Sequence, residues 1–125
     1  MFLYSRNSLA REVADKLVYI LVSLESILLK DSNEPIMQNI GDRMAFLIGK
    51  PEERLEIVKN VKDVYGLRSS FIHHGKDISF ENIESMKIFM RNSWQVNLFL
   101  IYNIYRFKNK LELIKYIDKI KYGAR

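Results

Sequence analysis

The stretch that decides the fold of this chain is residues 51–75, PEERLEIVKNVKDVYGLRSSFIHHG. A proline and two acids open it, which suits the first turn of a helix. Gly75 follows at a position typical of a helix C-terminal cap. We therefore predict a helix from Pro51 to His73 or His74. Its predicted apolar stripe comprises Leu55, Val58, Val61, Val64, Tyr65 and Leu67.

Four further segments show apolar residues at helical spacing. They span about residues 8–30, 34–48, 79–107 and 110–122, with Ser8 and Ser79 as the N-caps of the first and third. The second half of segment 79–107 is apolar on nearly every side, which is typical of a helix inside a bundle or at a subunit interface. Only two prolines and five glycines interrupt the 125 residues. The sequence therefore predicts one domain, an all-α bundle of four to five helices.

The net charge of +5 lies in the C-terminal segment. Residues 106–125 hold seven basic side chains against two acidic ones, whereas residues 1–105 are balanced. A segment of this kind suits a polyanion such as RNA or DNA, although a solvated, lysine-rich helix face has the same composition.

The chain has no cysteine, which excludes disulfides and thiolate metal sites and agrees with a reducing cytoplasm. The apolar run 96–107 is shorter than the ~20 residues that span a bilayer. The run 17–29 contains an acid and precedes no cleavage site, so it is not a signal peptide. No carboxylate stands at ligand spacing from the histidines. We expect a cytoplasmic protein with no membrane partner, metal or cofactor.

Arg68 and His73 are the main candidate site residues. An arginine can hold a phosphate through two parallel hydrogen bonds, and a histidine can transfer protons near neutral pH. Residues five apart on an ideal helix differ by about 140° in direction. The two can converge only if the helix frays or tightens before Gly75, or if a second subunit supplies one of them. The structural alternative is an ion pair for the arginine and carbonyl capping by the histidine.

Three elements of the sequence resemble the HEPN superfamily, and more narrowly its Apea-like group. Residues 67–75, LRSSFIHHG, resemble the R-x(4–6)-H signature with its neighbouring leucine, serine, apolar pair and glycine. Residues 23–29, SLESILL, resemble the "LE-x-LL" element of the first helix. Residues 43–48, RMAFLI, resemble the "R-x-A-x-L-L" element, and the acidic start at 51–54 also matches. The resemblance covers about residues 20–76.

The resemblance implies a small helical bundle that dimerises, and a metal-independent ribonuclease of toxin–antitoxin, phage-defence or RNA-processing systems. Arg68 would hold the scissile phosphate, His73 would move protons, and Ser69 would orient one of them. The product would be a 2′,3′-cyclic phosphate. His74 also satisfies the signature spacing, and the choice between the two histidines stays open with His73 favoured.

The leading interpretation is RNA cleavage or RNA binding at a composite Arg68/His73 site at the dimer interface. The alternative is a non-catalytic interaction or dimerisation module of a larger defence or regulatory assembly. In either case the expected partners are RNA, a second copy of the chain, and an antitoxin or other defence protein.

Glu25 is the one carboxylate on an otherwise apolar helical stretch. A buried carboxylate needs a partner, and we expect that partner to be Arg43. The alternative is that Glu25 lies near the signature. A further set of side chains is expected in the core or at a dimer surface rather than at a nucleotide-stacking site: Met86, Phe89, Met90, Trp94, Phe99 and Tyr102.

Overall fold

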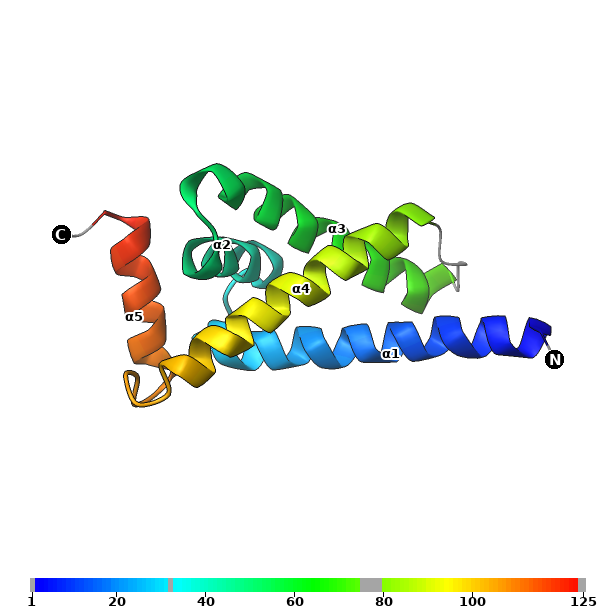
Figure 1. Ribbon diagram of the computed structural model, residues 1–125, viewed down its shortest axis with the longest axis horizontal. Coiled ribbons are helices and arrows are strands. Elements are labelled where there is room, and N and C mark those ends of the chain that lie inside the picture. The colour runs from blue at the N-terminus through cyan, green and yellow to red at the C-terminus, as the bar shows by residue number, and fades with distance from the viewer. Residues whose placement is uncertain (1, 32, 75–79, 124–125) are drawn as a thin grey trace.

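The computed structural model describes the backbone of residues 2–31, 33–74 and 80–123, and the side chains at 12, 15–31, 33–69 and 82–123. All regular structure in these ranges is helical, as predicted (Figure 1). In chain order the elements are α1 (Phe2–Leu28), α2 (Ile36–Ile48), the 3-10 helix η1 (Pro51–Glu53), α3 (Arg54–His74), α4 (Phe80–Tyr102) and α5 (Lys110–Lys121). None of these described helices is both long enough and apolar enough to cross a membrane.

Helix α2 is the centre of the bundle, because it contacts each of the other four α-helices and packs most extensively on α3. Gly41 faces α3, where a Cβ would lie 3.5 Å from the Cα of Val58, in ordinary van der Waals contact. Helix α1 extends along the molecule and α4 crosses it, whereas α5 lies across the end opposite the N-terminus (Figure 1).

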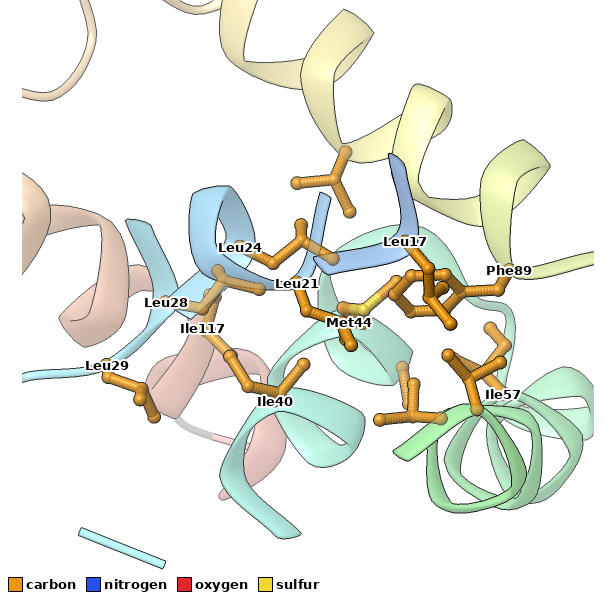
Figure 2. Close-up of a cluster of buried hydrophobic side chains, with 14 of the residues drawn as sticks. Leu17, Leu21, Leu24, Leu28, Leu29, Ile40, Met44, Ile57, Phe89 and Ile117 are labelled. Carbon is orange, nitrogen blue, oxygen red and sulfur yellow. The ribbon is translucent and has the colours of Figure 1, made fainter. Parts of the chain in front are cut away.

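The core is one cluster of buried apolar side chains drawn from all five α-helices. Figure 2 shows leucines of α1, among them Leu17 and Leu21, directed toward Met44 of α2 and Phe89 of α4. Ile40 of α2 joins Ile117 of α5 to the same cluster.

Arg43 fixes the connection between α1 and α2. Its guanidinium donates to the Leu28 carbonyl oxygen at 2.6 Å and to both carboxylate oxygens of Glu34, at 2.8 and 3.1 Å. These bonds hold the pKa of Glu34 down, from 4.5 to about 2. The expected pair between Arg43 and Glu25 is therefore wrong. The loop residue Glu34 takes the arginine, while Glu25 faces α3.

Two helix boundaries differ from the prediction. Helix α1 begins at Phe2, so Ser8 lies inside it and does not cap it. Helix α4 ends at Tyr102 and does not reach Phe107. There the chain turns so that the ring of Phe107 packs on Phe99 and Tyr116, with centroids 6.2 and 5.4 Å away. The predicted caps at Ser79 and Gly75 lie outside the described residues.

The apolar stripe of α3 is only partly correct. Val61 and Val64 are buried, but Leu55 is 84% exposed and Val58 also faces solvent, and Ile57 is buried in their place. The side chains of α4 that were expected in the core or at a dimer surface divide between the core and the surface of the chain. Met86 and Phe89 are in the core, whereas Trp94 is 60% and Tyr102 83% exposed.

Candidate functional site

Helix α3 brings Tyr65 and Arg68 to its face toward α1. Tyr65 and Arg68 are three residues apart, a spacing that places side chains on the same side of a helix. Their common neighbour is Glu25, in the last turn of α1. The site is thus built by two helices that the core already holds together.

Tyr65 holds the Glu25 carboxylate in place. Its hydroxyl donates a hydrogen bond of 2.8 Å to Oε2 of Glu25, across 40 residues of sequence. Burial raises the pKa of the Tyr65 hydroxyl, and the adjacent Glu25 carboxylate raises this pKa further. The tyrosine therefore stays protonated and remains a donor at any physiological pH.

Arg68 lies beside the same carboxylate oxygen. Its Nη1 is 3.7 Å from Oε2 of Glu25, which is an ion pair but too long for a good hydrogen bond. The Arg68 side chain is 30% exposed. The carboxylate thus attracts and orients the guanidinium, which makes no hydrogen bond to another of the described residues. This contact also agrees with the structural explanation of Arg68, in which the arginine only forms an ion pair with an acid.

The remaining predicted site residues follow on the same helix. Ser69 is exposed one position after Arg68. The backbone of α3 is helical through His74. The α-helical geometry therefore separates the directions of positions 68 and 73 by about 140°. The side chains of His73 and His74 lie outside the described residues.

Glu25 is the site residue that sequence reasoning assigned to the wrong partner, and Tyr65 was assigned only to the apolar stripe. The available signal was the resemblance of residues 23–29 to a family element next to the signature. Nothing local in the sequence marks the hydroxyl of Tyr65 as the donor, because the contact depends on how α1 and α3 pack.

Elsewhere in the described residues, a polar groove of about 740 Å³ separates α3 from α4, lined in part by Glu56, Asn60 and Arg91. No three His, Asp or Glu side chains in the described part of the chain gather as metal ligands. Comparison of the chain with protein-family models, curated proteins and solved structures found no match.

Proposed function

We propose that this protein is a metal-independent endoribonuclease of HEPN type, acting as a homodimer. One observation carries the proposal: Arg68, partly exposed, is oriented by Glu25 in the last complete turns of α3 before the two histidines. A guanidinium that is held in position can offset the charge that develops on a phosphorane-like transition state.

His73 supplies the proton transfer in this proposal. It acts as the base toward the ribose 2′-hydroxyl or as the acid toward the leaving 5′-oxygen. Ser69, exposed beside Arg68, orients the phosphate or the histidine. The reaction needs no metal, because the nucleophile is the neighbouring hydroxyl of the substrate itself, and it ends in a 2′,3′-cyclic phosphate.

The test is cleavage of single-stranded RNA and tRNA by purified protein in EDTA. We expect Arg68→Ala and His73→Ala each to reduce the rate by roughly 100-fold or more. His74→Ala decides between the two histidines. The matched control is Arg91→Ala, which removes an exposed arginine from α4. This variant should cut RNA at the rate of the unmodified protein. Equal cutting by all variants would contradict the proposed site.

A non-catalytic interaction module is the second candidate, and a groove favours it. The groove lies between α1 and α4, has a volume of about 310 Å³ and is lined by apolar side chains including Ile20 and Met90. Tyr19 and Trp94 border it with 77% and 60% of their surface exposed. RNA left intact by every variant, together with unchanged folding, would select this candidate.

A further inference from the structure

The outer side of α5 and the turn before it carry lysines that the fold does not use. Lys108, Lys110, Lys115 and Lys119 are all exposed. Within the described residues none of the four has a carboxylate within ion-pair distance; in this region only Lys121 does, with Asp42 on α2. Lys115 and Lys119, four residues apart, share one side of α5, and we refer to them, with Lys108 and Tyr105 in the turn before α5 and Tyr122 just after it, as the lysine face.

The same segment contains two acids, Glu112 and Asp118. Glu112 is turned inward to the start of α5, where its Oε1 accepts from the Lys108 backbone N–H at 2.8 Å. Its own N–H is bound by the Asn109 side chain. A carboxylate at a helix N-terminus also interacts with the positive end of the helix dipole. Residues 108–122 hold five lysines against these two acids, so the lysine face is positive.

Two tyrosines stand at the ends of the lysine face. Tyr105, in the turn before α5, is 100% exposed, and Tyr122, just after α5, is 74% exposed. The neighbouring rings of Phe107 and Tyr116 are instead packed, and Tyr116 supports the Arg106 guanidinium at 4.4 Å from its ring centroid. Exposed aromatic rings that alternate with cations along the chain are typical of surfaces on which unpaired bases stack.

We infer that the lysine face binds single-stranded RNA, with the lysines contacting phosphates and Tyr105 stacking on a base. An exposed helix face needs a continuous apolar stripe to enter a lipid surface, and in α5 and the turn before it the strongly exposed aliphatic side chains are two separate ones, Leu111 and Ile104. A purely acidic polypeptide would use the lysines but not the rings. The choice of RNA over DNA rests on the proposed function. The lysine face itself does not include Arg68, which is on α3.

The spacing along α5 fits a strand that follows the helix axis. Lys115 and Lys119 are four residues apart, so they lie on one side of the helix with a rise of about 6 Å between them. Both point away from the core residues Leu113 and Ile117. Removing them should therefore change charge without changing packing.

Fluorescence anisotropy tests the inference with a labelled RNA of about 15 nucleotides, within typical single-strand site sizes. The RNA is 2′-O-methylated, so binding is measured without cleavage. We expect the double variant Lys115→Gln/Lys119→Gln to reduce the slope of log K against log[salt] by about 1.4, the value for two phosphate contacts. We expect Tyr105→Ala to weaken binding by roughly 5-fold to 100-fold, the loss of one stacked base.

Two matched variants control for charge and aromatic content. Lys16→Gln/Lys87→Gln removes two exposed lysines from α1 and α4, and Tyr19→Ala removes an exposed ring from α1. Both should bind like the unmodified protein. The inference is overturned if these controls lose as much affinity as the test variants, or if the lysine-face variants bind normally. It is also overturned if polyglutamate competes as well as RNA.

The outcomes separate this inference from the proposed function. RNA binding that depends on the lysine face, without any cleavage of unmodified RNA, supports the inference and contradicts the ribonuclease. Cleavage that depends on Arg68, with normal binding by the lysine-face variants, supports the ribonuclease and contradicts the inference.

Discussion

Glu25 connects the signature of α3 to the rest of the molecule. One carboxylate oxygen accepts the Tyr65 hydroxyl and faces the Arg68 guanidinium, so the positions of both α3 residues depend on the same atom of α1. Tyr65 is therefore a positioning residue. Its neutral hydroxyl holds the Glu25 carboxylate, and that carboxylate orients the Arg68 guanidinium.

Removal of the Tyr65 hydroxyl tests this arrangement. We expect Tyr65→Phe to lower the free energy of unfolding by about 1 kcal/mol, because one partly buried hydrogen bond is lost. RNA cleavage should fall by less than in Arg68→Ala, since the guanidinium remains. Urea denaturation and the cleavage assay measure the two effects. Tyr116→Phe, which removes a hydroxyl from α5, is the control, and equal stability of Tyr65→Phe and the unmodified protein would contradict the prediction.

The pair between Arg43 and Glu34 makes stability depend on pH. The pKa of Glu34 is lowered from 4.5 to about 2 in the folded protein, so the unfolded chain takes up the proton first as the pH falls. The contribution is complete above about pH 5 and is lost toward pH 2. Allowing for solvent screening at a side chain that is 16% exposed, we expect about 1–2 kcal/mol.

The measurement is urea denaturation at pH 7 and pH 3 for the unmodified protein and for Glu34→Gln. The amide cannot titrate, so the variant should be less stable at pH 7 and should lose less stability on acidification. An identical drop in both proteins would show that other carboxylates account for the acid sensitivity.

At the scale of the elements, local signals predicted helices well and tertiary contacts decided their ends. Helices α2 and α5 lie within two residues of the prediction, because a proline precedes one and the Asn109 side chain caps the other. The end of α4 depends on the packing of Phe107 against residues of α4 and α5, which no local pattern encodes. Within the candidate site, Arg68 was recognisable from sequence, whereas its contact with Glu25 follows only from the packing of α1 on α3.

Gly49, at the end of α2, is a position where the fold needs a glycine for space. A Cβ there would lie 2.6 Å from Cδ1 of Ile57 and 2.7 Å from the backbone oxygen of Ala45. We expect Gly49→Ala to cost about 1–3 kcal/mol of stability, because a backbone atom cannot move aside easily. Thermal unfolding measures the change.

Gly66 is the matched control on α3, since a Cβ there meets no atom within 4 Å. Gly66→Ala should raise stability by about 0.5–1 kcal/mol through the helix propensity of alanine. If both variants are destabilised equally, a general intolerance of substitution, rather than the contact at Gly49, is the cause.

At the scale of the whole molecule, the candidate site and the lysine face lie on different elements: the site is formed by α3 and the last turn of α1, whereas the lysine face belongs to α5 and the turn before it. The C-terminal end of α3 points toward the end of the molecule that carries the N-terminus, whereas α5 lies across the other end (Figure 1). Under the two proposals, RNA that is held by the lysine face also reaches Arg68 on α3.

The regular geometry of α3 leads to the last prediction. Because α3 is helical through His74, positions 68 and 73 point about 140° apart, and a second subunit is the simplest way to complete the site. We expect a mixture of Arg68→Ala and His73→Ala subunits to regain activity that neither variant has alone. In a mixed dimer, one subunit contributes its intact arginine and the other its intact histidine.

The expected recovery follows from symmetry. Random exchange in an equal mixture makes about half of the dimers mixed, and each mixed dimer holds one complete site of two, so about a quarter of the unmodified activity should return. Subunits mixed after brief exposure to mild denaturant and then assayed in EDTA provide the measurement. A single variant carrying both substitutions, mixed with unmodified protein in the same way, controls for the exchange step. If the two single variants stay inactive together while that control shows exchange, Arg68 and His73 do not act across a dimer interface.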